Sequence, residues 1–523
     1  MTLRRSRTLP CLLAICTLAS SPAPAQTAPW TTPLRGSWVQ AGPPSQGDVN
    51  LTASEIVVSD GENSTVHQAA EFLAGDIEKI SGSRPPVVKT PGGDRVSIRL
   101  ATLGHGEVPA AIGAGAMQGQ WESYRIVTAG RIVWLVGSNP RGTAFAAYSL
   151  SERLGIDPLY IWTGYTPQHR DPLVLKRTSF AQGPPAFRYR GFFHDDEDLL
   201  PRPFDANGYP LQTGDVPLDW YKRFFETALR LRMNMVAPYT RVHRRYEVQK
   251  LASDWGLYYT SHHYDILVSN PFGLVRFSLA AERCVKPEWN WFTNREGMLK
   301  FWRGGVVENR DLDVIWPVGM RGTEDRPFVF PAETTDDDKA KTFREVINEQ
   351  VKMVGDLLPR DKTPLFHFTM YSEMLPQYQR NPAAFDLPSD VIVVWPDDND
   401  GHMRALPSGL GKWKHGVYYH LAYLGGMRPG AKFSATTSAR SQSRRKSAWP
   451  SGFLRSMVTL RLLALKSRKN IASRPGTSGR IPASATCRSC TTTSGCARTR
   501  CSTRRRSRLA TCSTRRAIDH PPA

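Results

Sequence analysis

The chain has 523 residues, 40% of them hydrophobic and 10% aromatic, a composition that is typical of a globular protein and excludes fibrous and membrane-embedded classes. Its length exceeds that of one compact domain. The net charge of +21 would favour a nucleic-acid partner, but residues 1–430 carry 47 basic and 46 acidic side chains, whereas residues 431–523 carry 21 basic side chains and one acid, Asp519. We therefore expect neither nucleic acid nor a membrane as the partner of the body of the chain.

The first 25 residues have the pattern of a cleavable secretory signal. Arg4, Arg5 and Arg7 precede a short apolar run at residues 9–19, and a small-x-small site ends at Ala25. The apolar run is too short to span a bilayer. We expect cleavage after Ala25 and a secreted or periplasmic mature protein.

Residues 50–180 have the alternation of a small α/β domain. Runs with strand character stand at residues 55–58, 96–100, 124–127 and 132–136, and helical spacing of apolar residues covers 66–80 and 143–154. The last two strand runs flank Ala129 and Gly130, which predicts a hairpin. This domain is expected to end near residue 180.

Residues 187–430 show short apolar runs separated by segments of helix length, which is typical of repeated βα units around a parallel sheet. Seven runs qualify as strands, at residues 189–193, 233–237, 258–261, 314–318, 365–370, 391–395 and 417–420. Helices are best supported at residues 220–231 and 339–358. The predicted fold class is α/β: a small amino-terminal α/β domain followed by an incomplete (β/α)₈ TIM-type barrel that lacks its eighth unit.

Residues 431–523 change abruptly to Arg, Ser, Thr, Ala and Cys. Such a low-complexity basic tract predicts disorder. One hypothesis is that a reading-frame error or similar artefact near residue 431 replaced the native carboxyl terminus, and the alternative is a genuine basic tail. A nucleic-acid binder would depend on this tail alone.

Polar side chains follow almost every predicted strand of the barrel, where the carboxyl ends converge on one mouth. They are Asp196 and Glu197 after the first strand, His262 after the third, Arg321 and Asp325 after the fourth, Tyr371 and Glu373 after the fifth, Asp397, Asp398 and Asn399 after the sixth, and His420 at the seventh. Cleavage of a glycoside needs two carboxyl groups and donors that grip the sugar. Arg321 adds a planar fork that can hold a uronic carboxylate. His262 and His263 are adjacent on a strand and point to opposite faces, so we expect no metal there.

Six motifs in this region resemble, in the same order, those of glycoside hydrolase family 115. They are the segments at residues 191–197, 261–263, 319–322 (Gly-Met-Arg-Gly), 370–373 (Met-Tyr-Ser-Glu), 395–401 and 416–420 (Gly-Val-Tyr-Tyr-His). The resemblance spans roughly residues 50–430. It implies hydrolysis, with inversion and without a cofactor, of α-1,2-linked glucuronic or 4-O-methylglucuronic acid on xylan or a uronic-acid-bearing oligosaccharide.

On this resemblance Glu373 and Asp325 are the expected catalytic pair, and Asp397 and Asp398 are the reserve candidates. Which carboxyl is the acid stays open. The expected substrate-binding residues are Asp196, Glu197, His262, Arg321, Tyr371, Asn399 and His420. The alternative function is that of a degenerate, non-catalytic sugar-binding homologue, which would keep the aromatic and His contacts but lose one working carboxyl.

Overall fold

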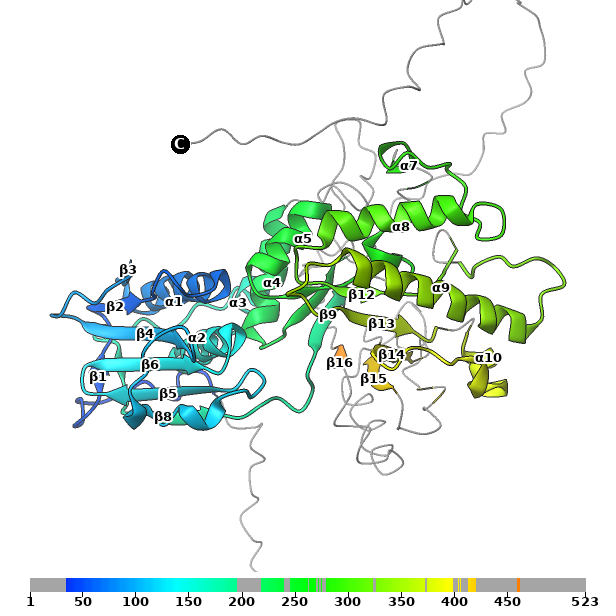
Figure 1. Ribbon diagram of the computed structural model, residues 1–523. Helices are drawn as coiled ribbons and strands as arrows, with labels where there is room; N and C mark the ends of the chain where they lie inside the picture. Colours follow the sequence, from blue (N-terminus) through cyan, green and yellow to red (C-terminus); the bar gives the residue numbers. More distant parts are fainter. Residues whose placement is uncertain are drawn as a thin grey trace, which may run out of the picture.

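The computed structural model describes residues 34–194, 218–238, 245–261, 263–269, 279–322, 326–371, 374–397 and 413–419, with isolated positions at 271, 274, 403, 405, 459 and 460 (Figure 1). These residues form an amino-terminal α/β unit and a second α/β unit, drawn in blue to cyan and in green to orange. No helix among them is long and apolar enough to cross a membrane.

The amino-terminal unit is built on a six-stranded mixed sheet in the order β3-β2-β4-β6-β5-β8. Its strands are β2 (Ser54–Val57), β3 (Val87–Val88), β4 (Val96–Thr102), β5 (Tyr124–Ala129), β6 (Ile132–Gly137) and β8 (Ser179–Gln182). Strands β2, β3, β4 and β6 pair in parallel, whereas β5 pairs antiparallel with β6 and β8. A short pair, β1 (Val49–Asn50) and β7 (Val174–Leu175), lies beside it. The predicted hairpin of β5 and β6 is confirmed.

Two helices pack together over this sheet, α1 (Ser64–Ser81) and α2 (Pro140–Leu154). The Asn63 side chain accepts a hydrogen bond from the Thr65 amide and caps α1, which ends at Gly82 in the left-handed conformation. Asn139 caps α2 in the same way. Gly137 ends β6 where an added Cβ would lie 2.0 Å from the Thr143 backbone nitrogen, so the close start of α2 requires glycine. The shorter helices are η2 (Ala110–Ile112), η3 (Gly115–Met117) and α3 (Tyr160–Thr163).

The second unit contains an eight-stranded sheet in the order β11-β10-β9-β16-β15-β14-β13-β12, with parallel pairing throughout. The strands are β9 (Arg190–His194), β10 (Met235–Pro238), β11 (Tyr258–Tyr259), β12 (Ile315–Pro317), β13 (Leu365–Thr369), β14 (Val391–Pro396), β15 (Lys414–Tyr418) and β16 (Thr459–Leu460). An isolated parallel bridge joins Tyr259 of β11 to Val314, the residue before β12. The first seven strands lie where the apolar runs predicted them.

The structure differs from the expectation of a missing eighth strand. The two-residue β16 lies between β15 and β9, with Thr459 opposite Val417 and Arg190, and Leu460 opposite Gly191. It comes from the basic segment for which no strand was expected. Gly191 also allows β10 to approach, because a Cβ there would lie 2.2 Å from the Met235 carbonyl oxygen.

From β9 to β14, helices lie between successive strands of this sheet, as expected for βα units. They are α4 (Leu218–Arg230), α5 (Arg245–Asp254), α7 (Leu279–Glu282), α8 (Arg295–Asn309), α9 (Asp336–Leu357) and α10 (Leu375–Arg380), with short turns η4 (Ile266–Val268) and η6 (Pro382–Ala384). Helix α9 begins after Thr335, whose hydroxyl accepts from the Asp338 amide, and buries Phe343, Val346 and Ile347. Trp302, Trp316 and Trp395 are among the largest fully buried side chains of the second unit. The hydrophobic core of this unit is continuous with that of the amino-terminal unit.

The two units are joined by packed helices and by ion pairs. Helices α1 and α2 lie beside α4, and Asp76 of α1 pairs with Arg230 of α4 (Figure 1). Arg141 of α2 pairs with Asp313 at 2.9 Å and donates to the Gly256 carbonyl oxygen. The amino-terminal unit is therefore fixed against α4 and the loops before β11 and β12.

Candidate active site at the carboxyl ends of the strands

Three side chains meet at the carboxyl ends of β11, β12 and β13. The guanidinium carbon of Arg321 lies 4.6 Å from the ring centroid of Tyr371. The ring of His263 stacks on Tyr371 with centroids 4.0 Å apart and an interplanar angle of 20°. Arg321 is 4% exposed and His263 is 9% exposed, whereas Tyr371 is half-buried. A cation, an imidazole and a phenol ring thus form one cluster, which we call the Tyr371 cluster.

Arg321 is held in place by the backbone of the loop that carries it. Gln350 of α9 is fully buried, accepts a hydrogen bond from the Gly319 amide at 2.7 Å and donates to the Gly319 carbonyl oxygen at 2.8 Å. Gly319 has φ +130°, a conformation that L side chains rarely adopt, and a Cβ there would press on the Phe368 ring at 3.1 Å. Trp289 donates from its indole nitrogen to the Arg321 carbonyl oxygen at 2.7 Å. These contacts fix the loop between β12 and the Tyr371 cluster.

His263 stands on a strained turn. The Ser261 hydroxyl donates to the Asp265 carbonyl oxygen at 2.9 Å, and the chain then passes through Leu267 and Val268 at φ +48° and +56°. A β-branched residue in the left-handed region is uncommon and costs about 1–2 kcal/mol. The turn can pack against α8 because Gly305 of that helix has no side chain. A Cβ at Gly305 would lie 2.1 Å from Ser269 Oγ. Packing of α8 therefore stabilises the loop that positions His263.

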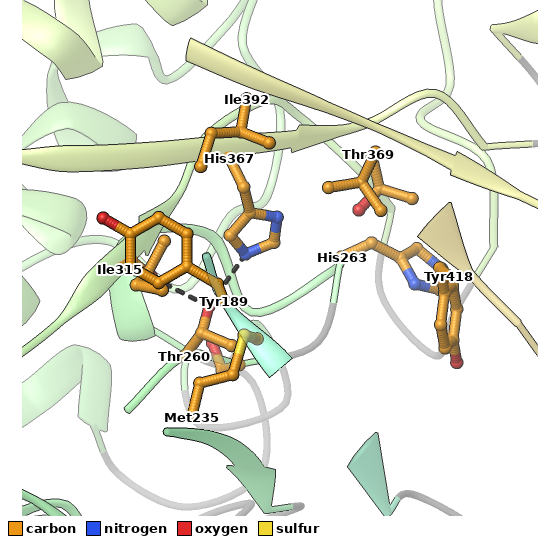
Figure 2. Close-up of a pocket in the computed structure, with 11 residues that line it drawn as sticks. Tyr189, Met235, Thr260, His263, Ile315, His367, Thr369, Ile392 and Tyr418 are labelled. Carbon is orange, nitrogen blue, oxygen red and sulfur yellow. Dashed lines mark hydrogen bonds between the residues drawn. The ribbon is translucent and has the colours of Figure 1, made fainter. Parts of the chain in front are cut away.

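Beneath this cluster, the strands enclose a pocket that is largely apolar (Figure 2). His367 of β13 and Thr260 share a hydrogen bond of 2.8 Å, and the Thr260 hydroxyl also donates to the Ile315 carbonyl oxygen at 2.8 Å. Because the hydroxyl proton is used on Ile315, Thr260 accepts from His367 Nε2–H, which places a proton on Nε2. Burial lowers the pKa of His367 to about 4. His367 is therefore an uncharged structural donor at neutral pH.

Asp397 follows β14, at the same carboxyl end of the strands as the Tyr371 cluster. Its backbone amide donates to the Tyr418 carbonyl oxygen at 3.1 Å, and its side chain is buried, with the residue 7% exposed. Two residues earlier, Trp395 donates to Nδ1 of His415, and burial lowers the pKa of His415 to about 4. A second histidine of the sheet is therefore neutral.

The structure places three of the residues predicted from the sequence for the site. Arg321 and Tyr371 are in contact, and Asp397 lies at the end of the next strand along the sheet. The others lie outside the described residues: Glu373, Asp325, Asp398, Asp196, Glu197, His262, Asn399 and His420.

Sequence reasoning missed three polar side chains around this site. His263 was passed over for its neighbour His262, and it lies on a turn beyond the end of β11, where strand alternation does not indicate which of the two faces the mouth. His367 lines the pocket from a predicted strand. A histidine within an otherwise apolar run was the sequence feature that could have identified it. Gln350 had no local signal, because it contacts the loop from the middle of α9. Among the described residues no group of three or more His, Cys, Asp or Glu could hold a metal ion.

Comparisons with known proteins agree with this arrangement. The family model described as Glycosyl hydrolase family 115 matches residues 182–458. Among solved structures, a family GH115 4-O-methyl-alpha-glucuronidase with specificity for decorated arabinogalactans is similar, with 22% identity, a TM-score of 0.65, and coverage of 79% of this chain and 54% of that chain. The chain thus spans about half the length of that enzyme.

Other solved structures are less similar. A GH20 beta-N-acetylhexosaminidase from Streptomyces coelicolor A3(2) has 12% identity and a TM-score of 0.36, covering 80% of this chain and 74% of that chain. A GH138 enzyme targeting pectin rhamnogalacturonan II has 15% identity and a TM-score of 0.38, covering 68% of this chain and 39% of that chain. No curated protein matches the sequence.

Proposed function

Because the chain belongs to glycosyl hydrolase family 115, we propose that it is a glycoside hydrolase that removes α-1,2-linked glucuronic or 4-O-methylglucuronic acid from glucuronoxylan. The observation that carries this proposal is the Tyr371 cluster, in which Arg321 is almost fully buried at the carboxyl ends of the strands. A buried guanidinium beside an aromatic ring suits a sugar that bears a carboxylate, because it supplies two parallel donors and an apolar face.

We assign the eight-stranded sheet to the (β/α)₈ TIM-type barrel that the sequence predicts. Eight parallel strands and the bridge from Tyr259 to Val314, which links the two end strands of the order, support it. In such a barrel the loops after the strands form one mouth. The segments that follow β11, β12 and β13 meet in the Tyr371 cluster, as that assignment requires.

Glu373 and Asp325 are the proposed catalytic pair. In the sequence, Glu373 stands two residues after Tyr371 and Asp325 four residues after Arg321, so each follows closely on a member of the proposed substrate-binding cluster. An inverting enzyme needs carboxyl groups about 6.5–9.5 Å apart, which leaves room for a water, and neighbouring strands about 4.8 Å apart can supply it. Asp397 and Asp398 are the reserve pair.

The remaining proposed contacts are polar groups at the same mouth. Arg321 holds the uronic carboxylate, and Tyr371 contributes its ring to the sugar. Asp196, Glu197, His262, Asn399 and His420 complete the proposed binding set. The amino-terminal pattern of residues 1–25 supports export with cleavage after Ala25, which amino-terminal sequencing of the secreted protein would test.

The proposed function is tested with the purified full chain and glucuronoxylan. The expected products are free (4-O-methyl)glucuronic acid and a less substituted xylan, with the initial anomer of the acid, followed by proton NMR, inverted to β. A carboxyl-reduced glucuronoxylan is the matched control and should lose its side groups much more slowly. Saturable binding of glucuronoxylan without release would instead identify a non-catalytic sugar-binding homologue, and absence of both would contradict the proposal.

A further inference from the structure

A second pocket, of about 350 Å³, lies between the two units, where α2 and β5 of the amino-terminal unit meet the starts of β9 and β10. Its polar lining includes Glu122, Ser149, Glu152, Arg153, Arg190 and Arg232, and we call it the junction pocket. Arg190 is the first residue of β9 and Arg232 precedes β10. The junction pocket therefore lies at the amino ends of the strands, whereas the Tyr371 cluster lies at their carboxyl ends.

Two of the three arginines of the junction pocket are neutralised by carboxylates. Arg190 pairs with Glu122 at 2.7 Å, and Arg232 pairs with Glu152 at 2.6 Å and donates to Ser149 Oγ. Glu122 is completely buried and also accepts from the Asn234 amide group at 2.8 Å. These two pairs cancel, so the charge of the pocket is decided by the third arginine.

Arg153 of α2 has no carboxylate within ion-pair distance among the described residues. Its Nη1 donates to the Ser149 carbonyl oxygen at 3.3 Å, and its guanidinium carbon lies 4.8 Å from the Trp38 ring and 4.6 Å from the Phe180 ring. The residue is only 9% exposed. Burial lowers the pKa of the Arg153 guanidinium below its usual value, and nearby Arg232 acts in the same direction, whereas Tyr124 and Glu152 act in the opposite direction without reversing the shift. The junction pocket therefore holds one uncompensated positive charge. A buried cation without a counter-charge is energetically costly.

The backbone around this charge is strained at two positions that line the junction pocket. Glu122 has φ +51° and Arg232 has φ +58°, although neither residue is glycine. Arg232 stands just after α4, where helices commonly end with glycine, and its amide donates to the Leu229 carbonyl oxygen at 2.8 Å. Glycine would remove a cost of about 1 kcal/mol, but it would also remove the guanidinium that pairs with Glu152. Strain of this kind gathers at sites that bind ligands.

We propose that the junction pocket is a second, non-catalytic site that binds a small hydroxylated carboxylate, of the size and charge of a uronic acid, with Arg153 on the carboxylate. The carboxylate supplies the counter-charge that the described residues lack. The hydroxyl groups of the ligand can exchange hydrogen bonds with Glu152 and with Gln182 at the rim. The choice of a uronic acid as ligand rests on the proposed function, but the site does not use the Tyr371 cluster.

The test uses the full chain carrying Arg321→Met, so that binding at the proposed active site does not mask the second site. Calorimetric titration at low ionic strength with sodium glucuronate should show saturable binding, and glucose, the neutral control, should not bind. Adding Arg153→Met should weaken glucuronate binding at least tenfold, and Arg153→Lys should weaken it less, because the ammonium keeps the charge but loses the fork.

A third variant protects the test against misfolding of Arg153→Met. Glu152→Gln frees Arg232 from its carboxylate, so it should tighten glucuronate binding several-fold, a direction that a merely structural role of these residues does not predict. The proposal is overturned if the Arg321→Met chain does not bind glucuronate saturably, if Glu152→Gln weakens binding, if a folded Arg153→Met variant binds as the parent does, or if inorganic phosphate binds as tightly as glucuronate. None of these readings depends on release of sugar from xylan, so this inference and the proposed function can fail separately.

Discussion

Asp76 of α1 and Arg230 of α4 are joined by two parallel hydrogen bonds, of 2.9 Å and 2.7 Å, and their side chains are 0% and 3% exposed. Burial alone disfavours the charged guanidinium, but the facing Asp76 carboxylate outweighs that effect and raises the pKa of Arg230 above its usual value. The pair joins the two units at a point with no access to solvent. It therefore couples the stability of the amino-terminal unit to that of the sheet unit.

Replacing Asp76 by Asn should destabilise the whole described body of the protein. The change removes the buried carboxylate that accepts two of the Arg230 hydrogen bonds and leaves only Glu226, at 2.8 Å, as a counter-charge, which costs up to about 3–5 kcal/mol. Urea unfolding followed by tryptophan fluorescence measures the loss. Asp60→Asn is the matched control, because the Asp60–Lys89 pair is 69% and 73% exposed and such pairs contribute less than about 1 kcal/mol. Equal effects of the two substitutions would show that the buried pair does not join the units.

Acidification should weaken the fold between about pH 6.5 and pH 4. His367 and His415 have folded pKa values lowered to about 4, whereas the unfolded chain takes up protons below about 6.5. The unfolded state thus binds more protons in that window, so the stability present above pH 6.5 is lost as the pH falls towards 4. His367 alone should account for about 3 kcal/mol at pH 4. His367→Leu should flatten the dependence of unfolding free energy on pH, and an unchanged slope would contradict this.

Gln350 should act as a positioning residue for Arg321. Gln350→Leu removes both hydrogen bonds to Gly319, which leaves two backbone groups unpaired and frees the loop that carries Arg321. We expect a loss of about 1–3 kcal/mol in stability. The KM for a glucuronide should rise, with a smaller change in kcat. Glu349→Gln on the exposed side of α9 is the control. A Gln350→Leu enzyme with lower stability but an unchanged KM would make Gln350 purely structural.

Arg321→Met should raise the KM for a glucuronide far more than the KM for the matching neutral glucoside. The loss of two charge-assisted hydrogen bonds to the carboxylate corresponds to about 1.5–3 kcal/mol, or roughly tenfold to hundredfold in affinity. Steady-state kinetics on both substrates give the ratio. Arg360→Met, at an exposed position, should change neither value. Equal increases for the two substrates would show that Arg321 does not contact the carboxylate.

The sequence predicted the strands of the sheet well, because buried parallel strands are short continuous apolar runs and seven such runs lie at β9 to β15. It also placed Arg321 and Tyr371 at neighbouring strand ends, and the structure brings them together. It did not predict β16, since Thr459 and Leu460 stand in a basic tract whose most apolar stretch, residues 457–465, is interrupted by Arg461. The contacts of Gln350 and of Asp76 with Arg230 join residues distant in sequence, and no local pattern predicts them.

The sequence did not predict which of the two adjacent histidines, His262 or His263, contacts Tyr371. Strand β11 ends at Tyr259 and His263 lies on the turn that follows, so strand alternation does not decide which histidine reaches Tyr371. The structure stacks His263 there. The same limit applies to the carboxylates, because spacing places Asp325, Glu373 and Asp397 near the mouth but does not order them by distance from the sugar.

The central claim is tested most directly by the release of uronic acid from glucuronoxylan by the full chain and by its Glu373→Gln variant. Both proteins should bind the polymer with similar affinity, because the amide keeps the size and hydrogen bonding of the carboxyl. The account predicts that the parent chain releases (4-O-methyl)glucuronic acid and that Glu373→Gln lowers the turnover number by a factor on the order of a thousand or more. Release by Glu373→Gln at close to the parent rate would contradict the assignment and would direct the search to Asp196, Glu197, Asp397 and Asp398.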